Sequence, residues 1–262
     1  MRSIWAFFWG ALVGVLGGLI GLGGAEFRLP ILVSFFQYRM LQAVIINLIV
    51  SLATVSFSLI FRGGIVGVES IAANWSVVAN ILAGSLIGSY VGVHYATQVN
   101  EQALNKIVVA FLLALSAVLI GHNFIFALGI LQLPGLLKIV AGFVAGSVIG
   151  VFSSMLGVAG GELIIPTIIL IFGIDIKLAG SLSLAISIPT ILMGLFKYQG
   201  QHRLKEIKPE KGFIGLMAAG SVLGAFLGSS LLRYVSSAAL YLILGLILFV
   251  SALKLAKHKP AA

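Results

Sequence analysis

Ten apolar segments follow one another along the chain, separated by short polar stretches. They cover residues 5–22, 27–36, 41–61, 75–97 and 103–121, and then residues 136–156, 163–172, 178–196, 213–232 and 240–255. A helix needs about 20 apolar residues to cross a hydrocarbon core of about 30 Å. Segments 27–36 and 163–172 are about half that long. The pattern predicts an all-α integral membrane protein with short broken or re-entrant helices at its centre.

The sequence repeats itself at an offset of 136 residues. The offset superposes Gly10 on Gly146, Gly14 on Gly150, Gly21 on Gly157, Gly24 on Gly160, Glu26 on Glu162 and Pro30 on Pro166. We therefore predict two membrane repeats of about five segments each, 1–126 and 127–262, which together form one transmembrane domain. The distribution of Lys and Arg does not distinguish inverted from parallel halves. We favour inverted halves, because segment 5–22 already spans the membrane and leaves segment 27–36 to turn back.

The composition excludes a soluble globule. Of the 262 residues, 60% are hydrophobic and only 9% are charged, which leaves no room for a catalytic domain outside the membrane. The chain has no cysteine, and its four histidines form no metal-binding pattern. We therefore expect no enzyme activity, no cofactor and no metal site.

The formal net charge of +9 indicates topology rather than a nucleic-acid partner. Basic residues concentrate in the stretches 197–211 and 254–259. The positive-inside rule places both stretches, and with them the C-terminus, in the cytoplasm, where they face anionic lipid.

A glycine-rich turn precedes each short segment, at residues 21–24 and 157–161. Irregular backbone at membrane depth occurs where it is buried in protein or lines a wet cavity. Pro30 and Pro166 have a structural role, because the first turn of a helix needs no backbone donor. Free N–H groups at two such helix starts would form an anion site, which predicts substrate binding at Gly23, Gly24, Ala25, Gly160 and Gly161. The alternative is that the glycines only allow close helix packing.

Glu26 and Glu162 are two of only seven acidic residues, and each lies in apolar surroundings where a charge is expensive and usually functional. Each could cap a helix, carry a coupling proton or ligate a coupling cation such as Na⁺, and we assign both to coupling. Arg28 has Ile164 as its counterpart. It could bind substrate, pair with Glu162 or snorkel to the membrane surface, and we rank the last two together above the first.

The third segment of each half carries a polar stripe on one helical face. The stripes are Asn47, Ser51, Thr54 and Ser58 in the first half, and Ser183, Ser187 and Thr190 in the second. Such a face either lines a polar pathway, with Asn47, Ser51, Ser183 and Ser187 contacting substrate, or serves packing. Glycines at every fourth residue of the fourth segments indicate a structural packing role for Gly84, Gly88, Gly220 and Gly224.

The paired glycine turns, the short segments with an early proline and the small-residue helix 179–184 resemble the sulfite exporter TauE/SafE family over essentially the whole chain. The resemblance implies a secondary transporter of sulfite, a sulfonate or a related anion in a bacterial inner membrane. The positions that match the family's paired motif are Gly21, Gly23, Gly24 and Pro30, and Gly157, Gly160, Gly161 and Pro166. The chain departs from the family pattern at Glu26, Arg28 and Glu162, where it places charges.

We therefore predict a multi-pass permease that moves a small anion, a sulfur oxyanion or organosulfonate, by alternating access with proton coupling. Two alternatives stay open: a passive channel, and a transporter of Na⁺ or a metal cation that uses the paired glutamates. A membrane-embedded enzyme would need a nucleophile with a base, or a metal cluster, and the sequence shows neither. The expected partners are a small anion and the lipid bilayer, with a coupling proton or Na⁺ and without nucleic acid.

Overall fold

The computed structural model describes residues 2–95, 134–156, 160–200 and 211–257, together with residues 109, 113, 116, 117 and 119–121. These residues are almost entirely helical and contain no strand. The main elements in chain order are α1 (Arg2–Leu16), η1 (Gly17–Gly21), α2 (Ala25–Pro30), η2 (Ile31–Phe35), α3 (Met40–Val66), α4 (Val68–Ala73), α5 (Trp75–Tyr95), α8 (Gly135–Leu156), α9 (Gly161–Phe172), α10 (Ile176–Gly200), α11 (Lys211–Leu231) and α12 (Ser237–Lys257). The predicted all-α class is confirmed.

Five helical stretches of the described chain are long and apolar enough to cross a membrane. They are Arg2–Gly21, Gln42–Val66, Gly135–Ser153, Ile176–Phe196 and Lys211–Leu231. All of α9 and parts of α5 and α12 form shorter apolar helices. The protein is therefore a multi-pass integral membrane protein. The predicted segment 103–121 lies largely outside the described residues, and the hydrophobic pattern does not predict α4.

The elements at the two predicted short segments do not extend far enough to cross a membrane. The helix α9 has 12 residues, which extend about 18 Å at the α-helical rise, and α2 continues into η2 only as far as Phe35. Left-handed glycines precede both elements, with φ values of 79° at Gly23, 73° at Gly24 and 72° at Gly160. A side chain at these three positions would strain the backbone.

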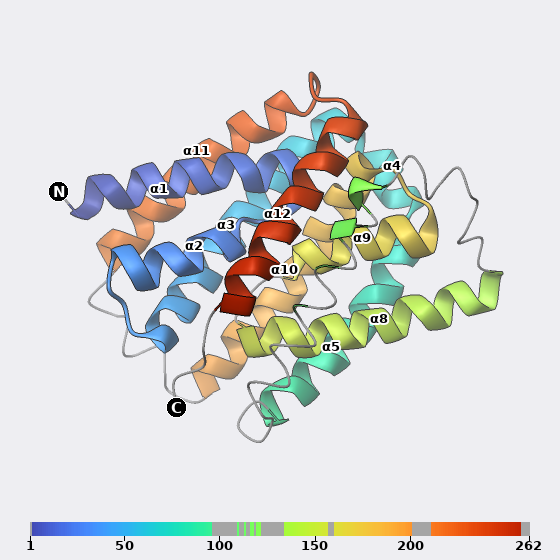
Figure 1. The fold of residues 1–262 in the computed structure, drawn as a ribbon, viewed down its shortest axis with the longest axis horizontal. Helices are drawn as coiled ribbons and strands as arrows, with labels where there is room; N and C mark the ends of the chain where they lie inside the picture. The colour runs from blue at the N-terminus through green and yellow to red at the C-terminus, as the bar shows by residue number, and fades with distance from the viewer. Residues whose placement is uncertain are drawn as a thin grey trace.

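Two helix pairs frame the bundle: α1 lies beside α11, and α5 lies beside α8 (Figure 1). Glycines bring the paired backbones together, because a Cβ at Gly224 would meet the carbonyl of Ala11, and a Cβ at Gly88 would meet the carbonyl of Ser147. These two contacts correspond to each other under the 136-residue offset. Equivalent contacts occur one helical turn earlier, at Gly84 and Gly220. The first segment of each half thus packs on the fourth segment of the other half.

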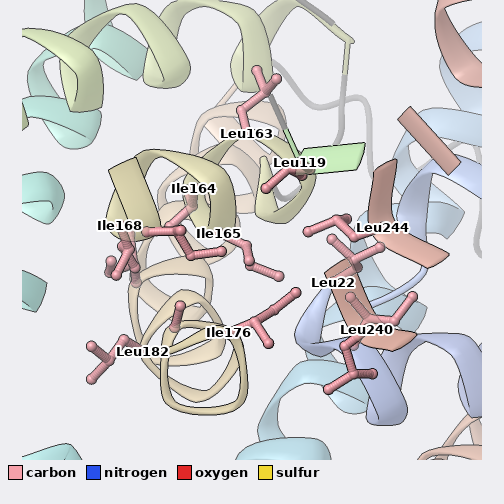
Figure 2. Packing of buried hydrophobic residues seen from close by; sticks show 14 of the residues in the cluster. Leu22, Leu119, Leu163, Ile164, Ile165, Ile168, Ile176, Leu182, Leu240 and Leu244 are labelled. Atoms are coloured by element: carbon pink, nitrogen blue, oxygen red, sulfur yellow. The ribbon is translucent and has the colours of Figure 1, made fainter. Parts of the chain in front are cut away.

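An apolar cluster packs the beginning of the first glycine turn against the second half. Figure 2 shows Leu22 beside Leu240 and Leu244 of α12, across from Ile165 and Ile176. Each of these side chains is at most 1% exposed. Burying one such side chain contributes about 1.5–3 kcal/mol. The cluster therefore holds Leu22, a residue of the first glycine turn, in a fixed position.

Candidate functional site

The first glycine turn and the start of α9 come together in the structure, while residues 157–159 of the second turn lie outside the described residues. The first residue of α9 packs against the entrance to the first turn, since a Cβ at Gly161 would lie 2.9 Å from the carbonyl oxygen of Leu22. Glu26 lies in the first turn of α2, and Glu162 lies in the first turn of α9. Each half therefore contributes one acidic residue at the start of a short element near this junction.

Both glutamates have buried carboxylate oxygens. Among the described residues, neither oxygen of Glu26 has a hydrogen-bond partner, although the backbone N–H groups of Glu26 and Glu162 lie near its carboxylate. Oε2 of Glu162 is likewise buried without a partner there. The two carboxylates are close enough to repel each other, and Glu26 also attracts Arg28 electrostatically. Two carboxylates in one buried site are unfavourable when both are charged.

Arg28 is completely buried and extensively hydrogen-bonded. Its Nη1 donates to Asn47 Oδ1 (3.3 Å) and Ser51 Oγ (2.8 Å), and its Nη2 donates to Thr54 Oγ1 (3.3 Å), Ser221 Oγ (3.3 Å) and the Gly23 carbonyl (3.4 Å). All five acceptors are neutral, and the buried Nε has no partner in the described part of the chain. The idea that Arg28 snorkels to the membrane surface is therefore wrong, and its hydrogen bonds do not go to Glu162.

We call the four side chains that hold this guanidinium the Arg28 cradle: Asn47, Ser51, Thr54 and Ser221. Asn47 also donates through Nδ2 to the carbonyl of Ala25 at 3.0 Å, so it connects α3 to the start of α2. Three residues of the predicted polar stripe thus face Arg28. Sequence reasoning missed Ser221, which lies 193 residues from Arg28.

The equivalent positions of the other half hold no charge. We call the side chains at these positions the Ile164 cradle, after the counterpart of Arg28 under the 136-residue offset: Ser85, Ser183, Ser187 and Thr190. The hydroxyls of Ser85 and Thr190 hydrogen-bond to each other at 3.3 Å. Oγ of Ser183 is buried without a hydrogen-bond partner among the described residues.

Arg62 is a second buried arginine, and sequence reasoning missed its role. The hydrophobic pattern ends the third segment at Phe61 and treats Arg62 as a loop residue, whereas α3 continues to Val66 and buries this side chain completely. Its guanidinium donates to the carbonyls of Gly18 (2.9 Å), Leu19 (2.7 Å) and Lys177 (2.6 Å) and to Ser181 Oγ (3.1 Å). The last carbonyls of a helix lack donors within that helix, so Arg62 closes the end of η1 and connects it to α10.

In the part of the chain that the structure describes, no three His, Cys, Asp or Glu side chains are grouped as a metal site would require. Among the described residues near the junction, Arg28 and Arg62 are fully buried, and Glu26 and Glu162 are partly buried.

The family model described as "Sulfite exporter TauE/SafE" matches residues 6–255. The chain belongs to the sulfite exporter TauE/SafE family. This confirms the resemblance found in the sequence, and membership in the TauE/SafE family implies a membrane transporter of sulfur-containing anions rather than an enzyme. Comparisons with curated proteins and with solved structures give no match.

Proposed function

We propose that this TauE/SafE protein is a secondary transporter of a small sulfur oxyanion or organosulfonate that works by alternating access. The observation that carries the proposal is the Arg28 guanidinium, which is completely buried and bonded only to neutral acceptors. Burying a charge is costly unless an opposite charge compensates it. Glu26 attracts Arg28 but is not hydrogen-bonded to it, so an anionic substrate beside Arg28 would supply its direct partner.

The substrate would bind beside Arg28, where the two glycine turns meet. The unpartnered Nε–H of Arg28 is a donor for a charge-assisted hydrogen bond to a sulfonate or sulfite oxygen. Backbone N–H groups at the start of α9 add donors that carry no cost of ordering a side chain. We assign substrate binding to Arg28 and to Gly23, Gly24, Ala25, Asn47, Ser51, Gly160, Gly161, Ser183 and Ser187.

We assign coupling to Glu26 and Glu162, with one proton carried by the pair. With both carboxylates charged, the site repels an anion and Glu26 competes with the substrate for Arg28. Uptake of one proton removes one negative charge and the repulsion between the two glutamates. The anion then binds beside Arg28, and loss of the proton on the opposite side of the membrane expels it.

Alternating access requires two halves that can move relative to each other. The matching contacts of α1 with α11 and of α5 with α8 support a division into halves 1–126 and 127–262. We propose that these halves are inverted, as in other transporters whose interrupted helices meet at a central site.

We place the protein in a bacterial-type inner membrane with its C-terminus in the cytoplasm. Three lysines in the stretch 254–259 support this side by the positive-inside rule. Two reporters fused to the C-terminus, one active only in the cytoplasm and one only outside it, test the orientation. Activity of the second reporter alone would contradict it.

The main experiment is flux in proteoliposomes loaded with sulfite, sulfate, thiosulfate, sulfoacetate, taurine or acetate, with and without gradients of pH and Na⁺. We expect saturable movement of one sulfur anion that a pH gradient accelerates. Glu26→Gln and Glu162→Gln should each abolish the acceleration, because either variant removes the repulsion between two carboxylates that favours uptake of the shared proton. Glu69→Gln is the matched control, since Glu69 is an exposed residue of α4. Flux that neither saturates nor responds to any gradient would indicate a passive channel instead.

A transporter of Na⁺ or a metal cation is the second candidate. The unpartnered carboxylate oxygens of Glu26 favour it, because hard cations prefer oxygen ligands. In that case no anion would move, an ion current would appear, and Glu26→Gln and Glu162→Gln would abolish cation binding. Persistence of anion movement in either variant would separate this candidate from the proton-coupled one.

A further inference from the structure

The Arg28 cradle and the Ile164 cradle are built alike but are occupied differently. Under the 136-residue offset, Thr54 and Ser221 of the first correspond to Thr190 and Ser85 of the second. In the Arg28 cradle, the guanidinium lies between the two hydroxyls and donates to both at 3.3 Å. In the Ile164 cradle, the two hydroxyls bond directly to each other at 3.3 Å. The hydroxyls of Ser85 and Thr190 are therefore arranged as we would expect those of Thr54 and Ser221 to be if no arginine lay between them.

Asn47 and its counterpart Ser183 also differ in whether their polar groups are hydrogen-bonded. Asn47 accepts from Arg28 and donates to Ala25, so its amide is used in both directions. Its counterpart, Ser183, is 0% exposed, and its hydroxyl has no partner among the described residues. A buried polar group without a partner is costly, and proteins keep few of them. The hydroxyl of Ser183 is thus a buried polar group that no charged side chain uses in the described structure.

We propose that the Ile164 cradle is a neutral copy of the Arg28 cradle, and that the protein consequently binds one anion at a time, on the Arg28 side only. This inference rests on the proposed function, because it assumes that the anion is drawn to Arg28. The side chain at position 164 is an isoleucine that packs beside Ile165 and Ile168 on α9 and offers no charge to an anion (Figure 2). A single arginine therefore decides both the number of anions and the side on which they bind.

Moving the arginine from one cradle to the other tests the proposal. Sulfite is the probe, and calorimetric titration in detergent gives both its affinity and its stoichiometry. The wild type should bind one sulfite, and Arg28→Ile should weaken binding about 10- to 100-fold, as expected for loss of a charged hydrogen-bond donor. The double variant Arg28→Ile, Ile164→Arg should regain at least tenfold of that loss, at a stoichiometry of one. A wild type that binds two sulfite ions, or a double variant that binds no better than Arg28→Ile, would overturn the proposal.

A second measurement does not depend on the ligand. Ile164→Arg is compared with Ile168→Arg, which places the same side chain one helical turn later, at a position that is 0% exposed. If the Ile164 cradle is equivalent to the Arg28 cradle, Ile164→Arg should survive heating in detergent better than Ile168→Arg, as judged by gel filtration. Equal losses of folded protein would overturn the equivalence. If Arg28→Ile itself does not fold, Arg28→Gln replaces it, because the amide keeps part of the hydrogen bonding without the charge.

The two proposals fail in different ways. If the folded wild type neither binds nor moves any sulfur anion, the proposed function fails, and the comparison of Ile164→Arg with Ile168→Arg still decides whether the two cradles are equivalent. If sulfite flux is saturable while Arg28→Ile binds sulfite like the wild type, the transporter stands and the assignment of its anion site to Arg28 is wrong.

Discussion

Replacing Arg62 by lysine tests how firmly one side chain holds the interrupted first span. The guanidinium makes four hydrogen bonds of 2.6–3.1 Å that join α3 to η1 and to the first turns of α10. Lysine is also a cation, but its ammonium is more strongly hydrated than a guanidinium and carries its donors on a single nitrogen. Both differences act in the same direction, against the lysine variant.

The expected loss follows from the donors that remain. A lysine ammonium has three N–H donors on a single nitrogen, so it cannot serve four acceptors that lie on two different elements. At least one of the bonds at Gly18, Leu19, Lys177 and Ser181 must be lost. A hydrogen bond from a charged donor contributes about 1.5–3 kcal/mol, and Arg62→Lys should therefore lower the free energy of unfolding by at least about 1.5 kcal/mol.

The assay is unfolding in mixed micelles of detergent and SDS, followed by tryptophan fluorescence. The chain has three tryptophans and no cysteine, so thiol-reactive dyes would report nothing. Arg39→Lys is the matched control, because Arg39 is exposed at the other end of α3. If both variants unfold at the same SDS fraction as the wild type, the geometry of the guanidinium does not stabilise the span, and the role given to Arg62 is wrong.

Two further predictions compare matched positions. Gly224→Ala should destabilise the protein by about 1–3 kcal/mol, because its Cβ would meet the backbone of α1, whereas Gly215→Ala on the same helix, with no atom within 4 Å of its Cβ, should be neutral or stabilising in the same SDS assay. Equal effects on stability would show that α1 and α11 can move apart to accommodate the methyl group without loss of stability. Thr54→Val should raise the KM for sulfite flux about tenfold, because Arg28 loses an acceptor, while Thr190→Val should change it by less than about twofold. A larger effect of Thr190→Val would place the anion in the other cradle.

Much of the fold follows from local properties of the sequence. Segment length and hydropathy predict the spans, because a membrane requires a fixed length of apolar helix. The short elements follow from the same rule, and the left-handed conformation of Gly23, Gly24 and Gly160 follows from the need for glycine at such a turn. The polar stripe of Asn47, Ser51 and Thr54 follows from helical periodicity. What these patterns leave open is the partner that each element faces.

The partners of the arginines could not be predicted for that reason. Arg28 bonds to Ser221 across 193 residues, and Arg62 bonds to Ser181 across 119. No periodicity in one segment reveals contacts at such separations. Hydropathy also treats an arginine at the end of an apolar run as the start of a loop, so the pattern ends the third segment at Phe61. The sequence does contain one signal that the helix continues past Arg62, because apolar residues resume there with Ile65 and Val66.

The duplication shows which residues are worth testing first. Packing contacts occur twice, as Gly88 on Ser147 and Gly224 on Ala11 demonstrate, so they report what both halves need in order to fold. The buried arginines occur once, because their counterparts are Ile164 and Tyr198. A buried charge is costly, so each arginine that occurs in only one half needs a reason to be kept. Arg62 has a reason in the fold, because it bonds η1 to α10. Arg28 is therefore the residue to test first for a function beyond folding.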